Sequence, residues 1–303
     1  MNEIGKKITD KIIEIHGSTD FTIGFLPYKR SMWNSMESVY EECYKAGAMA
    51  YIIPIPYYLM PDKEVVYEGD LYGGNILSVD MLKKMSFDYL VIHYPYDGNN
   101  RVTSMLPEYY TAELRNYGEV IFIPYSCSPG IMTRLHSGLV NIDYAFLCSE
   151  AERDAFIKEW GDHGVDFTGR VFGFGSPKMD AMAKAGRKSD GTFTTLICSS
   201  LAAYLHQAFN RIDMYRKAIT DELDAGHRVI FRPHPLLRQT IKSMRPDTER
   251  AYLEFLQWVE DAGAVIDESE YLEQAFEQAD YLISDPSSVI EMWLSSGREC
   301  RYL

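Results

Sequence analysis

The stretch Val229-Ile230-Phe231-Arg232-Pro233-His234-Pro235 decides the fold class, because a short apolar strand runs directly into an arginine and a histidine set between prolines. Proline fixes its own φ at about −65° and disfavours the helical region for the residue before it, so Arg232 and His234 are both held extended. Alternation then places the two side chains on one face. In an open α/β sheet that face opens on the crevice where ligands bind, although pairing with acidic neighbours would explain the two residues equally well at this point.

The residues around this stretch predict a parallel sheet. Strands alternate with helices and short loops join them, which is the pattern of a doubly wound fold. The predicted strands span 193–198, 228–231, 264–266, 280–283 and 300–303, and the predicted helices span 201–225, 248–262, 271–278 and 287–296.

The first half of the chain shows the same alternation after a leading helix at 1–16. Its long polar and aromatic loop, which runs to about residue 74, is more typical of a functional segment than of a plain connection. The predicted strands span 21–26, 48–55, 88–93, 120–123, 142–147 and 171–172, with helices at 33–46 and 107–116.

The segment from Gly175 to Gly191 is rich in Gly, Ala, Ser and Lys, and a new series of strands follows it. We place the domain boundary there. The expected fold is therefore α/β, with two Rossmann-like doubly wound domains over 1–185 and 186–303 that face a cleft.

The composition excludes several classes of partner. A net charge of −14 over 303 residues argues against a nucleic-acid or anionic-membrane surface, so any anionic ligand needs a local basic pocket. No run approaches the roughly 18 to 20 apolar residues that span a bilayer, which predicts a cytoplasmic protein. The five cysteines are scattered without metal-ligand spacing, so we expect reduced thiols and no metal site.

A second stretch of interest runs from Ile283 to Glu291, where a strand ends and two serines open a helix. The N–H groups of the helix and the hydroxyls of Ser287 and Ser288 can bind an anion, while ordinary capping explains the same residues and excludes nothing. Together with Arg232 and His234 they predict a diphosphate cradle.

Further polar residues complete this predicted site. Ser199 follows the first strand of the second series, and Asp285 and Glu291 could bind a ribose or glycerol hydroxyl, although a cap and a helix-face carboxylate are the simpler interpretation of the latter two. Additional positive charge, which a solvated helix face would also explain, comes from Arg238, Lys242 and Arg245.

On these two stretches the chain resembles the CDP-glycerol glycerophosphotransferases of teichoic-acid and capsule synthesis, whose fold is GT-B. The resemblance covers nearly the whole chain. It implies a first, acceptor-side domain and a second domain in which the Arg-x-His-Pro and Ser-Asp-x-Ser-Ser elements bind the donor's phosphates. Further segments that carry it are Phe25–Lys29, Ser31–Trp33, Ile53–Tyr58, Tyr67–Asp70, His93–Asp97, Asn100–Ser104 and Gly173–Asp180, the last with Lys178 where the family has arginine.

Two features depart from the family. The better-known polymerases carry Trp-His-Gly after the fourth strand, and its histidine is taken as the base, whereas Pro124–Cys127 stands here. Candidates for a catalytic base are then His93 and Asp97, although a lone histidine at a strand end is more often structural. The sequence also ends where the family has a final helix that crosses back to the first domain, so we expect that helix to be absent.

The expected function is transfer of glycerol phosphate from CDP-glycerol to a hydroxyl of a cell-surface glycopolymer precursor, with release of CMP. Arg232 and His234 would act on the leaving phosphate, and no cofactor is expected. A glycopolymer or lipid-linked acceptor would place the protein at the inner face of the plasma membrane in peripheral association. The alternatives are a GT-B glycosyltransferase that uses a nucleotide sugar and a non-catalytic nucleotide-binding or assembly protein.

Overall fold

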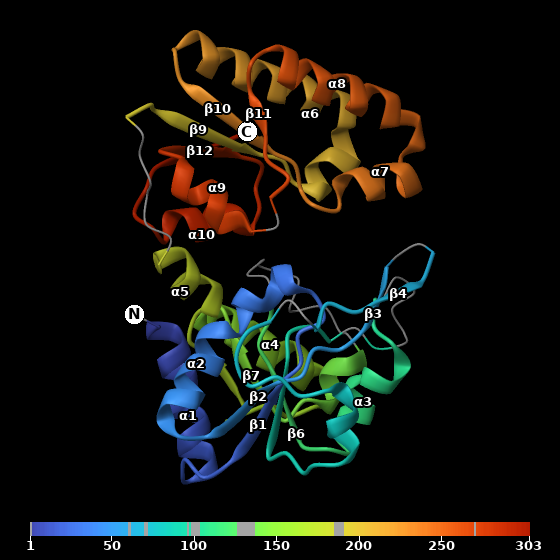
Figure 1. Ribbon diagram of the computed structural model, residues 1–303, viewed down its shortest axis with the longest axis vertical. Coiled ribbons are helices and arrows are strands. Elements are labelled where there is room, and N and C mark those ends of the chain that lie inside the picture. The colour runs from blue at the N-terminus through green and yellow to red at the C-terminus, as the bar shows by residue number, and fades with distance from the viewer. Residues whose placement is uncertain are drawn as a thin grey trace. The chain divides into compact units, whose positions relative to one another are not determined.

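The computed structural model of this chain describes residues 2–59, 62–69, 72–95, 97, 104–125, 137–184, 191–269 and 271–303. They form two compact units, Met1–Ala181 and Met182–Leu303, each built on its own parallel sheet with helices around it (Figure 1). The division falls within helix α5 (Pro177–Lys184), in the segment rich in small residues.

The first unit holds a six-stranded parallel sheet in the order β2-β1-β5-β6-β7-β8. From β1 the chain adds β2 on one side, and it then adds β5, β6, β7 and β8 on the other side of β1. The order of the strands therefore reverses between β1 and β5. We call the carboxyl ends of β1 and β5 the first switch point, because ligands of open α/β sheets bind at such a reversal. The strands are β1 Thr22–Phe25, β2 Met49–Ile52, β5 Tyr89–Ile92, β6 Glu119–Phe122, β7 Tyr144–Leu147 and β8 Val171–Gly173, and the helices are α1 Glu3–His16, α2 Glu37–Ala46, α3 Thr111–Leu114 and α4 Glu150–Asp162.

The second unit holds a five-stranded parallel sheet in the order β11-β10-β9-β12-β13. The order reverses between β9 and β12, and we call their carboxyl ends the second switch point. The helix α6 is broken at Gln207, where φ is −143° and ψ is 43°. The strands are β9 Thr194–Cys198, β10 Arg228–Arg232, β11 Val265–Ile266, β12 Tyr281–Ser284 and β13 Cys300–Tyr302, and the helices are α6 Leu201–Asp224, α7 Leu237–Met244, α8 Glu249–Asp261, α9 Leu272–Gln278 and α10 Ser288–Leu294.

Both sheets are covered on both faces. Along β5, Leu90 and Ile92 belong to one apolar cluster while Tyr89 and Val91 belong to another, as the alternation of a strand requires. In β10 the same division separates Val229 and Phe231 from Ile230. Strands buried on both faces appear in the sequence as continuous apolar runs. For this reason the ends predicted for the eleven strands of the two sheets lie within three residues of the observed ends.

Three local predictions were wrong or incomplete. The expected helix over 107–116 is interrupted by the extended residue Tyr110, between a 3₁₀ turn (η4, Pro107–Tyr109) and α3. The helix expected from Trp33 begins at Glu37, after the 3₁₀ helix η1 (Arg30–Ser35). The long loop contains an antiparallel hairpin of β3 (Tyr57–Leu59) and β4 (Glu64–Val66).

The prediction of reduced thiols is wrong for Cys148, which is disulfide-bonded, whereas Cys43, Cys198 and Cys300 are free. The fifth cysteine, Cys127, lies outside the described residues. The prediction relied on separation along the chain, and that separation sets no limit on which cysteines a fold brings together.

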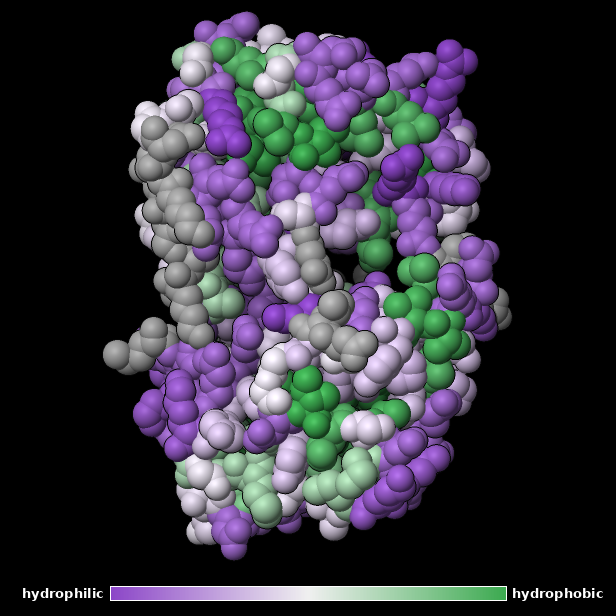
Figure 2. Space-filling view, viewed as in Figure 1, coloured by the Kyte–Doolittle hydropathy of each residue, from purple (hydrophilic) through white to green (hydrophobic). Residues whose placement is uncertain are grey.

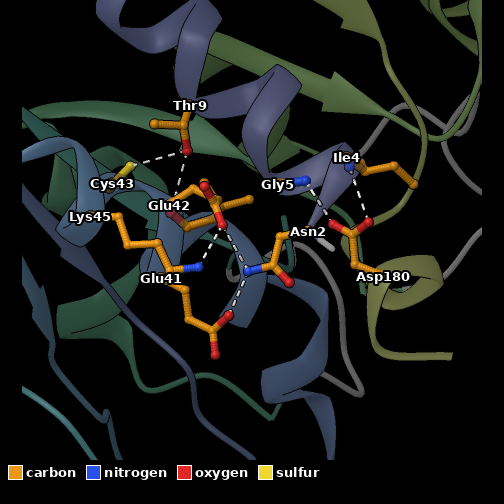
Figure 3. A network of polar contacts seen from close by, with 10 residues as sticks. Asn2, Ile4, Gly5, Thr9, Glu41, Glu42, Cys43, Lys45 and Asp180 are labelled. Atoms are coloured by element: carbon orange, nitrogen blue, oxygen red, sulfur yellow. Dashed lines mark hydrogen bonds and ion pairs between the residues drawn. The ribbon is translucent and has the colours of Figure 1, made fainter. Parts of the chain in front are cut away.

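Helix α5 is joined to helix α1 by the side chain of Asp180. The Asp180 carboxylate, only 3% exposed, accepts hydrogen bonds from the backbone N–H groups of Ile4 (3.0 Å) and Gly5 (2.7 Å) at the start of α1 (Figure 3). The preceding residue Asn2 makes no capping bond and binds Glu41 and Glu42 of α2 instead. Asp180 therefore acts as the cap of α1.

Hydrophilic residues prevail on the face shown in Figure 2, in keeping with the strong net charge. Within the described part of the chain, no helix has both the length and the apolar character needed to cross a membrane.

Candidate functional site

The second switch point is closed by hydrogen bonds between the loops that follow β9, β10 and β12. The Ser199 N–H donates to the Arg232 carbonyl (3.2 Å), and the Ser199 hydroxyl accepts from the His234 N–H (3.3 Å). On the other side, the Asp285 N–H donates to the carbonyl of Cys198 (3.3 Å). Three of the segments predicted from the sequence thus come together at the carboxyl end of one sheet.

Asp285 lies inside the protein and is not exposed to solvent. Its carboxylate accepts from the Ser200 N–H (2.8 Å), from Arg211 (2.9 Å) and from the Tyr215 hydroxyl. Burial, and next the Asp285 charge, raise the pKa of Tyr215, so the hydroxyl stays protonated and donates. The sequence prediction gave Asp285 a ligand hydroxyl, but in the structure its bonds join the loops on the two sides of the switch point.

Arg232 is also engaged within its own domain. The side chain is buried, and its guanidinium donates to the Asp267 carboxylate, to the Ser269 hydroxyl (2.9 Å) and to the Ser269 carbonyl (2.9 Å). These acceptors follow β11, the neighbouring strand. The acidic partner that the sequence left as an alternative is therefore present, and most of the guanidinium fork is occupied by it.

His234 is partly buried and has a defined tautomer. Its Nδ1 accepts from the Leu236 N–H (3.2 Å), so in the neutral ring the proton lies on Nε2. Burial, and next the charge of Arg232, lower the pKa of His234, which favours this neutral ring. At neutral pH the side chain therefore offers one N–H donor, from Nε2.

Ser287, Ser288 and Glu291 stand at the start of α10, and the two serines are partly exposed. The Ser287 hydroxyl makes no capping bond, contrary to the capping interpretation of this residue. Glu291 is exposed, and burial of part of its side chain raises its pKa. Because β9 lies between β10 and β12, His234 and Ser287 follow strands that are roughly 10 Å apart. A diphosphate, which is longer than a single phosphate group, suits donors that follow two such strands.

His93 lies at the first switch point, directly after β5, and is fully buried. Its Nδ1 lies 3.1 Å from the Ser35 hydroxyl, and its Nε2 has no partner among the described residues. Burial, and next the charge of Lys178, lower the pKa of His93 to about 3. Rings of three tyrosines lie around the imidazole, with centroids 5.1 to 6.2 Å away, from Tyr28, Tyr94 and Tyr125.

Asp97, the other candidate base, caps a helix. Its carboxylate accepts from the Thr111 N–H (3.0 Å) and the Thr111 hydroxyl (2.6 Å) at the start of α3. Burial raises its pKa and the bonds from Thr111 act in the opposite direction. The carboxylate thus has a structural role that the sequence prediction did not foresee.

Sequence reasoning missed a group of residues beside the first switch point. Lys29, which follows β1, lies with its Nζ 5.1 Å from the centre of the Tyr57 ring, and burial lowers its pKa although the Glu68 charge opposes this. Glu68 accepts from the Tyr57 hydroxyl (2.6 Å) and from the Arg30 N–H (2.6 Å). The sequence could have pointed to this group, because Lys29, Tyr57 and Glu68 each lie in a segment that carries the resemblance to the family.

A cavity of about 240 Å³ also lies in the first unit, lined by residues of 79–83 together with Glu108, Tyr109 and Tyr117. Tyr117 precedes β6, so the cavity opens near the amino ends of the strands and contains none of the predicted site residues. Across the described ranges, no group of three or more His, Cys, Asp or Glu side chains could hold a metal ion.

No family model matches the chain. No curated protein matches it either. Among solved structures, the UDP-GlcNAc 2-epimerase of Methanocaldococcus jannaschii, in complex with UDP-GlcNAc and UDP, is similar with a TM-score of 0.61 and 12% identity, over 93% of this chain and 83% of that one. The Neisseria meningitidis enzyme bound to UDP-GlcNAc has a TM-score of 0.59 at 12% identity, over 92% and 82%.

The wall teichoic acid polymerase TagF, in a variant soaked with CDPG, has a TM-score of 0.50 and 13% identity, over 99% of this chain and 77% of that one. At such identities the similarity concerns the fold. The expected fold class is confirmed: the chain is an α/β protein with two Rossmann-like domains of the GT-B class.

Proposed function

We propose that this chain is a GT-B enzyme that transfers glycerol phosphate from CDP-glycerol to a hydroxyl of a cell-surface glycopolymer precursor. The observation that carries the proposal is the pair of opposite tautomers at the two switch points. His234 offers an N–H donor, which suits a phosphate oxygen, and His93 offers a lone pair, which suits a hydroxyl. A transfer from a phosphate donor to an alcohol can use one group of each kind, a donor for the phosphate and an acceptor that orients the hydroxyl.

On the donor side, a diphosphate would extend across the end of β9. His234 would donate to one phosphate, and the hydroxyls of Ser287 and Ser288 to the other. Asp285 and Arg232 would act by holding the loops that carry these donors, since their own bonds lie within the domain. Glu291, which is exposed, remains available for a ribose or glycerol hydroxyl.

The reaction would proceed by displacement at the phosphorus that carries glycerol. The acceptor oxygen forms a bond to this phosphorus as the bond to the bridging oxygen breaks, and CMP leaves with that electron pair. Nε2 of His93 accepts the hydrogen bond of the acceptor hydroxyl, and the hydroxyl proton leaves to water as the new bond forms. A loose transition state asks little of the base, so a histidine whose pKa is about 3 can serve by orienting the hydroxyl.

The names of the similar structures support a nucleotide-linked donor, because they were solved with UDP-GlcNAc or CDPG. The proposal also includes a glycopolymer or lipid-linked acceptor. No nucleic acid is included, in view of the net charge of −14.

Donor binding tests the proposal directly. A thermal-shift screen of the full chain with CDP-glycerol, CDP-ribitol, CDP, CMP and UDP-GlcNAc should give the largest stabilisation with CDP-glycerol, about 2.7 kcal/mol at one hundred times the Kd. His234→Ala and the double variant Ser287→Ala/Ser288→Ala should each weaken binding by about tenfold or more. His206→Ala and Ser295→Ala/Ser296→Ala, which alter exposed His206 and the far end of α10, serve as matched controls.

The second candidate, an enzyme that acts on a nucleotide sugar, is favoured by the higher TM-scores of the two epimerases. Product analysis separates the two. Release of CMP from CDP-glycerol supports glycerol phosphate transfer, whereas a nucleoside diphosphate released from a UDP-sugar supports the alternative. We expect no cofactor, so activity should persist in EDTA. Stabilisation by none of the nucleotides would count against both candidates.

A further inference from the structure

The Ser35 hydroxyl is a hydrogen-bond partner of the His93 ring. Ser35, which ends η1, is fully buried, and its Oγ donates to the Met32 carbonyl (2.7 Å). Because the only proton of the hydroxyl is used there, Oγ presents a lone pair to the imidazole at 3.1 Å. The bond between Ser35 and His93 therefore requires the proton on Nδ1.

The opposite nitrogen is then an acceptor. Nε2 is buried and has no hydrogen-bond partner in the described ranges, and the same is true of the Tyr94 hydroxyl. A buried acceptor without a partner is rare in folded proteins, and it favours a ligand that can donate a hydrogen bond. The place of this nitrogen at the first switch point is where ligands of such sheets bind.

The groups packed against the ring come from several elements. They are Ser35 and the Met32 carbonyl from η1, Tyr28 after β1, Tyr94 next in the chain and Tyr125 after β6, and the charge of Lys178 on α5 also acts on the ring. Lys178 is the charged one of these. A cation near the ring opposes a second proton, so the ring keeps a single proton. The Ser35 hydroxyl favours that proton on Nδ1, and the Met32 carbonyl, which also accepts from the ring, acts in the same direction.

We propose that Ser35 is a positioning residue: it fixes His93 in the tautomer whose Nε2 lone pair accepts the hydrogen bond of the acceptor hydroxyl. The role of the acceptor hydroxyl in this proposal rests on the function proposed above. The position of the proton does not rest on it and can be measured separately.

Long-range ¹⁵N–¹H spectra of the histidine rings in the full chain test the tautomer. The signals of His93 are assigned by their loss in His93→Gln. In the wild type, Nε2 should show the shift of an unprotonated nitrogen and Nδ1 that of a protonated one. Ser35→Ala should move the pair toward a mixture, while Ser35→Thr, which keeps a hydroxyl, should restore the wild-type pattern. Ser38→Ala is the matched control, because it removes a buried hydroxyl without a hydrogen-bond partner in the described part of the chain.

Kinetics with CDP-glycerol and an acceptor give the second measurement. Ser35→Ala should lower kcat about tenfold and leave the KM for the donor unchanged, since one hydrogen bond to the imidazole is lost and the donor groups are intact. A wild-type proton on Nε2, or a Ser35→Ala variant with the wild-type tautomer and kcat, overturns the role of Ser35. If CDP-glycerol is not a substrate, the proposed function fails and the spectra alone decide whether Ser35 sets the tautomer.

Discussion

Arg211 donates to the Asp285 carboxylate at 2.9 Å, and the aspartate at this pair is fully buried while the arginine is only 16% exposed. The pair joins α6 to the loop after β12 at the second switch point. We expect Asp285→Ala to lower the free energy of unfolding by about 3 to 5 kcal/mol, because it leaves a buried guanidinium without its carboxylate. Urea denaturation measures this change.

The control is Asp221→Ala, which removes the exposed partner of Lys217 on the same helix and should cost about 0.5 kcal/mol or less. If Asp285→Ala were as stable as this control and bound CDP-glycerol more weakly, Asp285 would be a ligand-binding residue, as the sequence alone suggested.

Arg232 and Asp267 form a second ion pair in this domain whose side chains are largely buried. Arg232→Met should destabilise the protein by about 3 kcal/mol or more, and the double variant Arg232→Met/Asp267→Leu should recover most of that loss, because a well-packed apolar pair can replace a buried ion pair. Urea denaturation of the two single variants and the double variant gives the coupling. Full stability of Arg232→Met together with lost donor affinity would show instead that the guanidinium binds phosphate.

Much of the fold could be predicted from the sequence because the strands of both sheets are buried on both faces. The run from Val229 to Phe231 is apolar without interruption, and such runs end where the strand leaves the core. The hairpin of β3 and β4 was missed because each strand has only three residues, too few for the alternation of a half-buried strand to be recognised.

The predicted site shows what sequence separation conceals. Arg232 bonds to the carboxylate of Asp267, which lies 35 residues later in the chain. Asp97 accepts from Thr111, 14 residues later, and His93 bonds to Ser35, 58 residues earlier. Arg232 is the last residue of β10, His93 directly follows β5, and Asp97 lies in the segment after it. Whether each side chain is free for a ligand depends on a partner from another element, and no local pattern reports that partner.

The cap that Asp180 places on α1 predicts a stability effect within the first unit. Asp180→Ala should cost about 1 to 2 kcal/mol, because two N–H groups of the first turn of α1 lose their acceptor. Hydrogen exchange of the Ile4 and Gly5 amides should become faster. Asp10→Ala, which breaks an exposed pair with Lys6 on the same helix, is the control and should leave exchange at these amides unchanged.

The pKa of His93 predicts how stability depends on pH. Burial and the charge of Lys178 lower this pKa from 6.5 to about 3, so between these values the unfolded chain binds a proton that the folded chain does not. Stability therefore falls as the pH falls below 6.5, and this one residue should remove about 2 kcal/mol between pH 7 and pH 5. Urea denaturation at both pH values should show that His93→Gln loses less stability between pH 7 and pH 5 than the wild type does, by this amount. His163→Gln, which changes an exposed histidine, should behave as the wild type. Equal losses in the wild type and in His93→Gln would mean that the ring takes up a proton in the folded protein, which would also remove the lone pair that the proposed reaction needs.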